Sequence, residues 1–250
     1  MSDNQLEYFF LDPAAQWSDA LPVGNGRMGA MIYGNPRVER IFLSDATFWS
    51  GEPSSENNNP HGPRIVAEVR RLLLAGDIKA ANKLCEQIEG RKLNYGTNLP
   101  FGNLRIWMAH NDADGWGEYA GTYRRSLDLA TAVATVRYHV SPDAIDGPTA
   151  DYAREVFASH ADQLLVVHVT SSVQGTVGFR VGLDGDEQPF SVQPDGPDGI
   201  SMRVLARDYT HSDGRCGVDG YAHLRVCAER GQVSVQGAQI VVEGSDSATL

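Results

Sequence analysis

The sequence has little of what membranes, nucleic acids and disulfide scaffolds require. Its apolar runs stop after a few residues, as in residues 164–167 (LLVV), whereas a transmembrane helix needs about 20. Its 21 lysines and arginines face 32 aspartates and glutamates, and a formal charge of −11 argues against nucleic acid and anionic membrane surfaces as partners. Three cysteines without a C-x-x-C pair suit a reducing compartment. No signal peptide is visible after Met1, so we expect a cytoplasmic protein.

The chain is nevertheless long enough to bury a sizeable core, because 250 residues fit one large all-β domain or two small domains. Its 26 glycines and 12 prolines favour many short strands over long helices. Two apolar runs, residues 27–33 and 37–43, surround a Gly-Asn-Pro turn and predict a β-hairpin. From residue 127 onward the apolar residues alternate with polar ones. This pattern predicts strands at residues 132–140, 152–158, 164–170, 176–183, 200–206, 221–228, 232–236 and 239–243.

Helical periodicity is confined to residues 63–88, where Gly76 ends one predicted helix and Asp77 caps a second. The fold that these patterns predict is mainly β. We expect one antiparallel β-sandwich domain over residues 1–250 with a short two-helix insertion at about 63–88. Residues 248–250 read as a strand just beginning, so we expect the chain to be part of a longer protein.

Three motifs resemble ligand sites, and for each a structural interpretation is favoured. Residues 24–29 (GNGRMG) match the dinucleotide fingerprint, but a turn soon follows where that fingerprint needs a helix. Residues 111–115 (NDADG) hint at a calcium loop, yet the spacing places His110 and Gly121 at required ligand positions. His211, Cys216, His223 and Cys227 fit no compact zinc spacing. We therefore expect no cofactor and no metal.

Paired carboxylates are the remaining catalytic option. Glu39 and Asp45 flank the second strand of the predicted hairpin, and Asp184, Asp186 and Glu187 cluster in a loop. Acidic loop residues are usually solvated, and nothing in the sequence specifies a perturbed pKa. The residues alone identify no set of catalytic side chains.

Residues 44–51 (SDATFWSG) place two large aromatics among small polar residues. Phe48 and Trp49 either form a hydrophobic plug under a loop or present an aromatic surface to a sugar or a partner domain. Both interpretations stay open at this point.

Several stretches together resemble the amino-terminal domain of glycoside hydrolase family 95, a domain of the glycosyl hydrolase family 65 N-terminal type. Family 95 comprises α-L-fucosidases and some α-L-galactosidases. The stretches are residues 21–31 (LPVGNGRMGAM), 39–41, 47–51, 69–73, 123–129 and 154–159. The resemblance implies a β-supersandwich that precedes a helical (α/α)6 barrel, with the catalytic Glu and Asp of an inverting mechanism in that barrel. The family usually has Asn-Glu where this chain has Ser44-Asp45, and Leu where it has Phe48.

The resemblance thus implies that no catalytic residue lies in this chain, which would be inactive alone and would support a barrel of the same polypeptide. A fucosylated or related oligosaccharide would be bound by the whole enzyme. A non-catalytic carbohydrate-binding module, with Trp49 as its platform, and a scaffold domain that only docks the barrel are the alternatives.

Four residues are candidates for contact with the substrate rim or the barrel. Asn25 and Arg27 stand in the glycine turn, and Asp45 and Trp49 follow the paired strand. Because hairpin strands run antiparallel, the turn and the later loop should meet at one end of the sandwich. We expect this patch to face the barrel, while an internal ion pair of Arg27 and Asp45 is equally compatible with the sequence.

Overall fold

The described part of the protein forms two compact units. A computed structural model describes residues 6–109, 123–140 and 149–250. The first unit, here the β unit, spans Met1–Phe48, Pro100–Leu205 and Asp219–Leu250. The second, here the helical unit, spans Trp49–Leu99 and Ala206–Val218.

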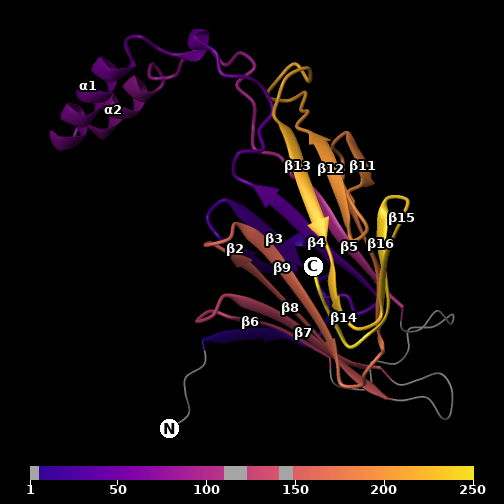
Figure 1. Ribbon diagram of the computed structural model, residues 1–250. Helices are drawn as coiled ribbons and strands as arrows, with labels where there is room; N and C mark the ends of the chain where they lie inside the picture. The colour runs from indigo at the N-terminus through magenta and orange to yellow at the C-terminus, as the bar shows by residue number, and fades with distance from the viewer. Residues whose placement is uncertain (1–5, 110–122, 141–148) are drawn as a thin grey trace. The chain divides into compact units, whose positions relative to one another are not determined.

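The β unit is built from three antiparallel sheets (Figure 1). The first sheet has the spatial order β1 (Glu7–Phe10), β6 (Arg124–Asp128), β7 (Val133–Val140), β8 (Ala150–Ser159), β9 (Leu164–Ser171), β17 (Ser247–Thr249) and β14 (Cys227–Glu229). The second has the order β15 (Gln232–Gln236), β16 (Gln239–Ser245), β10 (Val177–Asp184), β5 (Gly102–Met108), β4 (Val38–Asp45), β3 (Met28–Ile32) and β2 (Leu21–Gly24). The third consists of β11 (Phe190–Pro194), β12 (Gly199–Leu205) and β13 (Asp219–Arg225), and a 3-10 helix, η1 (Trp17–Asp19), precedes β2.

The core lies between the first two sheets, where alternate side chains of each strand point inward. Val136 and Val156 from the first sheet are fully buried, as are Ile41, Ile106 and Val181 from the second. Burying each such side chain stabilises the fold by about 1.5–3 kcal/mol. The strand β2 packs across β6, β7 and β8, which closes one side of the sandwich.

The third sheet covers part of the second. Its strand β12 packs on β10 and β16 and buries Ile200, Met202 and Val204 completely. The sheet therefore adds a second apolar layer beside the main core.

The helical unit contains α1 (Gly62–Leu74), α2 (Ile78–Cys85) and a 3-10 helix, η2 (Ser55–Asn57). Gly76 separates the two α-helices with a φ of 79°, a conformation that favours glycine. The Asp77 carboxylate then accepts a hydrogen bond from the Ala80 N–H at 3.1 Å and caps α2. The two helices predicted within residues 63–88 are thereby confirmed. No helix in the described ranges is both long enough and apolar enough to cross a bilayer.

The antiparallel architecture and the β3–β4 hairpin confirm the predicted fold class. The strand predicted at residues 221–228 is instead two strands, β13 and β14, in different sheets. Between them the Val226 N–H donates to the Asp198 carbonyl at 3.0 Å as the chain leaves the third sheet. Pro22 lies in β2, an edge strand, where the missing N–H costs no ladder hydrogen bond. That residues 1–250 form a single domain stays a prediction.

Candidate functional site

The glycine turn between β2 and β3 is held by Asn25. Its side-chain oxygen accepts hydrogen bonds from the backbone N–H groups of Arg27 and Met28, at 3.1 and 2.9 Å. Its side-chain nitrogen donates to the carbonyl of Ser159 at 2.9 Å, where β8 ends. Gly26, which lies between Asn25 and Arg27, has a φ of 93°, which glycine adopts at low cost. Asn25 therefore shapes the turn and ties the second sheet to the first. The segment is a strand–turn–strand hairpin, not the strand–turn–helix of a dinucleotide site.

Asp45 lies opposite this turn, because the register of the hairpin pairs it with Met28. One carboxylate oxygen accepts hydrogen bonds from the Thr47 backbone and hydroxyl groups, at 2.8 and 2.6 Å. The other lies 3.6 Å from the Arg27 Nε atom. Asn25, Arg27 and Asp45 thus meet at one end of the β unit.

A hollow of about 350 Å³ opens at this end of the β unit. Seven of its seventeen lining residues are leucines, and all three sheets contribute to them, as with Leu43, Leu164 and Leu224. The polar groups around it belong to Arg27, Ser44, Asp45, Gln163, Tyr221 and His223. We call this feature the end hollow.

The chemistry of the end hollow suits contact better than catalysis. Glycoside hydrolysis uses two carboxylates about 5–9.5 Å apart. Among the residues that line the hollow, Asp45 alone bears a side-chain carboxylate, and Thr47 and Arg27 already engage it. An apolar floor with a polar rim is instead typical of a surface that receives a side chain or a loop of a partner.

Glu39, the other carboxylate of β4, lies on the same strand face as Asp45 but deep in the core. It accepts hydrogen bonds from the Gly34 N–H at 2.9 Å and from the Arg154 guanidinium at 2.5 Å. Both ionic side chains are essentially inaccessible to solvent. Burial raises the pKa of Glu39, and the charge of Arg154 and nearby N–H groups oppose that shift. Glu39 therefore holds the sandwich together and has no access to a substrate.

Arg154 and Arg125 extend this buried network. Arg154 also donates to the Asn35 carbonyl at 3.0 Å, while its Nε and Nη1 atoms find no acceptor among the described residues. Arg125 donates to the carbonyls of Asp12 and Asp19, at 2.7 and 2.6 Å, and its burial lowers the pKa. The network anchors the loops around β2 and β4 to the first sheet.

The remaining acidic cluster is structural as well. Asp184 accepts hydrogen bonds from Asn103 at 2.6 Å and from Arg105 at 2.5 Å. Partial burial acts to raise its pKa, but these hydrogen bonds outweigh it and the pKa is lowered. Asp186 pairs with Arg40 at 3.3 Å. These ion pairs brace the outer face of the second sheet.

The other ligand motifs hold no assembled site in the described structure. His211 and Cys216 belong to the helical unit, whereas His223 and Cys227 belong to the β unit. Among the described residues, no three or more His, Cys, Asp or Glu side chains are grouped to hold a metal. The NDADG segment lies outside the described residues.

Trp49 belongs to the helical unit, where it lines a groove of about 650 Å³. Its backbone carbonyl accepts a hydrogen bond from the Val218 N–H at 2.8 Å, which fixes the strand-like course of the chain here. The groove also exposes Tyr95 and is bordered by Glu52, Asn57 and Asn58. Trp49 is 45% exposed and Tyr95 47%, so both rings are accessible. Phe48, by contrast, is buried against Phe101 in the β unit, with ring centroids 4.9 Å apart. The aromatic pair is therefore divided into one plug and one exposed surface.

Sequence reasoning missed several lining residues of these hollows. Tyr221 and His223 alternate on β13, a strand that was predicted, but their position beside β4 depends on how the sheets pack. Tyr95 lies in a segment without periodicity, and its exposure gives no signal in the sequence. Alternation predicts which residues share a face, not which faces meet.

The fold and the end hollow define a large antiparallel β-sandwich domain whose accessible hollow has a single side-chain carboxylate among its lining residues. Comparison with known proteins places it in a family. Residues 9–250 match the family described as "Glycosyl hydrolase family 65, N-terminal domain". The chain therefore belongs to this family of glycoside hydrolase N-terminal domains, which confirms the identification made from the sequence.

Two curated relatives are fucosidases by name. The chain is 33% identical to "Alpha-L-fucosidase 2" of Arabidopsis thaliana over 203 residues, which cover 81% of this chain and 22% of the relative. It is 27% identical to "Probable alpha-fucosidase A" of Aspergillus oryzae, covering 64% of this chain and 21% of the relative. The chain thus spans about a fifth of the length of the curated relatives it matches.

A solved structure shares the fold. It is named "Putative kojibiose phosphorylase from human microbiome" and superimposes with a TM-score of 0.50 over 98% of this chain and 32% of its own. The sequences are 8% identical, so the likeness concerns the fold alone.

Proposed function

We propose that this chain is the N-terminal domain of an inverting α-L-fucosidase-type hydrolase and that it supports a catalytic barrel elsewhere in the same polypeptide. The observation that carries the proposal is the 33% identity to an α-L-fucosidase across 81% of the chain. The end hollow agrees with a supporting role, because its lining offers contact surface and no pair of free carboxylates. The substrate would be a fucosylated or related oligosaccharide bound by the whole enzyme.

Two surfaces would serve this role. The end hollow, rimmed by Arg27 and Asp45 and braced by Asn25, would receive a loop of the barrel. The groove of Trp49 and Tyr95 would lie against the substrate rim, because exposed aromatic rings bordered by amides suit the apolar faces and hydroxyl groups of sugars.

The first experiment separates the domain from its catalytic partner. The 250-residue chain should not hydrolyse an aryl α-L-fucoside, whereas a polypeptide of the length of the relatives should. Turnover by the 250-residue chain that is lost on Asp45→Asn would overturn the assignment of chemistry to a barrel. A folded, longer polypeptide without fucosidase activity would overturn the proposed substrate.

The second experiment tests the two surfaces in the longer polypeptide. Arg27→Gln with Asp45→Asn should lower the stability of the interface between domains, and the matched surface pair Arg203→Gln with Asp219→Asn should not. Trp49→Ala should lower activity, while Trp17→Ala, at a tryptophan that is 52% exposed in the β unit, should leave it unchanged. Unchanged stability and activity in both test variants would leave the two surfaces without the proposed role.

A further inference from the structure

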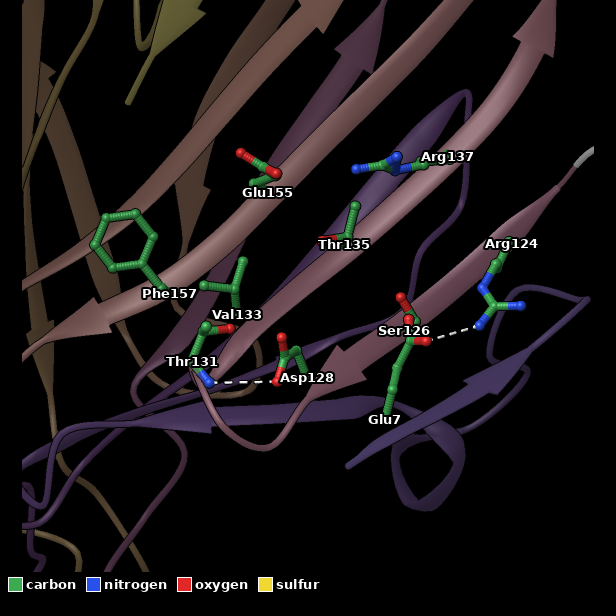
Figure 2. Close-up of a pocket in the computed structure, with 10 residues that line it drawn as sticks. All are labelled: Glu7, Arg124, Ser126, Asp128, Thr131, Val133, Thr135, Arg137, Glu155 and Phe157. Atoms are coloured by element: carbon green, nitrogen blue, oxygen red, sulfur yellow. Dashed lines mark hydrogen bonds and ion pairs between the residues drawn. The ribbon is translucent and has the colours of Figure 1, made fainter. Parts of the chain in front are cut away.

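A third hollow, of about 480 Å³, lies on the outer face of the first sheet (Figure 2). The strand register places Ser126, Thr135 and Glu155 in one row across β6, β7 and β8. Two residues further along the same face, β7 presents Val133 and β8 presents Phe157. Figure 2 shows these side chains on neighbouring strands of the sheet. We call this hollow the outer groove.

Two of the acidic residues in the outer groove are already engaged. The Glu7 carboxylate pairs with the Arg124 guanidinium at 2.9 Å. The Asp128 carboxylate accepts hydrogen bonds from the N–H groups of Ala130 and Thr131, at 2.8 and 3.3 Å. The hydrogen bond from Ala130 is the main cause of a lowered pKa at Asp128. These groups shape one side of the groove.

Arg137 and Glu155 differ from them. Neither side chain makes a hydrogen bond or an ion pair with any residue that the structure describes, although they lie on adjacent strands. Arg137 is exposed and Glu155 is half-buried. One free donor group and one free acceptor group of opposite charge therefore face the same hollow, and their charges cancel.

An apolar platform adjoins this polar pair. The Phe157 ring is 37% exposed, and the half-buried Val133 lies on the neighbouring strand of the same face. The hydroxyl groups of Ser126 and Thr135 add donors and acceptors between the platform and the Glu7–Arg124 pair. The groove thus combines an aromatic face with hydroxyl, guanidinium and carboxylate groups in a volume typical of small-ligand sites.

We propose that the outer groove binds a neutral oligosaccharide. A sugar ring presents C–H groups on one face, which suit the Phe157 ring, and hydroxyl groups at its edge. Neighbouring hydroxyls accept hydrogen bonds from Arg137 and donate to Glu155 at the same time, and charge-assisted hydrogen bonds of this kind are strong. This site is separate from the two surfaces of the proposed function and does not depend on them.

Other ligand classes fit the groove less well. Its lining holds three carboxylates against two arginines, so phosphate or uronate groups meet a net negative charge. A peptide strand adds to a free sheet edge, whereas the backbone groups of β6, β7 and β8 already pair within the sheet. A zwitterionic amino acid would satisfy both charges but would leave the Ser126 and Thr135 hydroxyls unused.

The test titrates the 250-residue chain with 2′-fucosyllactose, a neutral trisaccharide, and with 3′-sialyllactose, an acidic one of the same size, by calorimetry or NMR. We expect the neutral sugar to bind at least about fivefold more tightly. Phe157→Ala should weaken binding about tenfold through loss of the stacking face, and Glu155→Gln should weaken it about tenfold through loss of a charged acceptor.

Two controls keep the result specific. Phe190→Ala removes a phenylalanine of β11 that is 48% exposed and lies outside the outer groove, so it should leave binding unchanged. Thermal unfolding of every variant verifies that it folds. If Phe157→Ala disturbs the sheet, Glu155→Gln still tests the site, because it keeps the shape of the side chain. Binding that neither test variant weakens, preference for the acidic sugar, or no binding at millimolar concentration would each overturn the proposal. Binding of a free amino acid without binding of the sugar would do so too.

Discussion

Strand β4 carries two acidic residues on one face, and each forms an ion pair with an arginine from another element. One pair is buried and the other is accessible to solvent. Glu39 and Arg154 are sealed between the two sheets, where 0% and 1% of their side chains is exposed. Asp45 and Arg27 lie at the end hollow, where the arginine is 51% exposed and the closest charged atoms are 3.6 Å apart. The same pairing of an acid with an arginine is therefore a structural tie at one end of the strand and an accessible surface at the other.

The difference shows how to distinguish stability from function among charged residues of this fold. Removing one partner of a buried ion pair is costly, because the remaining charge is left buried without solvation. An exposed pair contributes little to stability and is free to exchange partners. Substitutions in the two ion pairs should reproduce this contrast.

The largest effect is expected for Arg154→Met. It should lower the free energy of unfolding by about 3–5 kcal/mol, because it leaves Glu39 in the core without its cation. Arg27→Met is the matched control and should cost less than about 1 kcal/mol. Urea unfolding followed by tryptophan fluorescence measures both values.

The double variant Glu39→Gln with Arg154→Met sharpens this result. Removing both charges leaves no unpaired ion, so most of the loss should be recovered. Equal losses for Arg154→Met and Arg27→Met would contradict the contrast between the two pairs.

A smaller effect concerns pH. The folded-state pKa of Glu39 lies above its ordinary value of 4.5, mainly because of burial. The folded protein thus holds a proton at pH values where the unfolded chain has released it, so the Glu39 contribution is full below pH 4.5 and is lost as the pH rises through the folded pKa. Asp184 has the opposite sign, because hydrogen bonds hold its pKa below its ordinary value of 3.8, and its contribution is lost as the pH falls.

Unfolding measured between pH 4 and 8 checks the sign. The wild type should lose stability relative to the Glu39→Gln, Arg154→Met double variant as the pH rises. Parallel pH curves for the two proteins would show that Glu39 does not titrate abnormally.

The contrast between the two pairs also marks the limit of sequence reasoning here. The hairpin and most strands could be predicted, because alternation and turn residues act locally. Strand register then brought Arg27 beside Asp45 as expected from antiparallel pairing. The patterns did not reveal that Glu39 is buried, since its partner Arg154 comes from another sheet more than a hundred residues away.

The hollows show the same limit. In the sequence, Arg137 and Glu155 are ordinary polar positions of two alternating strands. The structure places both in the outer groove, where neither has a partner among the described residues. Strand β1 was not predicted, because its short segment EYFF has neither alternation nor flanking turn signals strong enough to identify it. What the sequence cannot specify is which faces the tertiary packing brings together.

A third prediction concerns Asn25, whose side chain shapes the turn and reaches the first sheet. Asn25→Ala should destabilise the protein by about 1–2 kcal/mol, because it removes the side-chain oxygen that accepts from two N–H groups and the side-chain nitrogen that donates to the Ser159 carbonyl. Asn35→Ala is the control. Asn35 also accepts from two N–H groups, while its side-chain nitrogen has no acceptor in the described ranges. Denaturant unfolding should show a larger loss for Asn25→Ala, and equal losses would mean that the link between sheets contributes nothing.

The smallest effect is expected for the Arg27–Asp45 pair itself. A double-mutant cycle with Arg27→Gln and Asp45→Asn should give a coupling of about 0.2–1 kcal/mol, because solvent reaches the arginine and Thr47 already satisfies one carboxylate oxygen. The coupling should fall as salt is raised from 0.05 to about 0.5 M, since screening acts on exposed charges. The Arg203–Asp219 pair, with 51% and 38% exposure, is the control and should behave alike. A coupling above about 2 kcal/mol that is insensitive to salt would show that Arg27 and Asp45 form a structural tie like Glu39 and Arg154. The end hollow would then lose the exchangeable charged rim on which its proposed contact with the barrel depends.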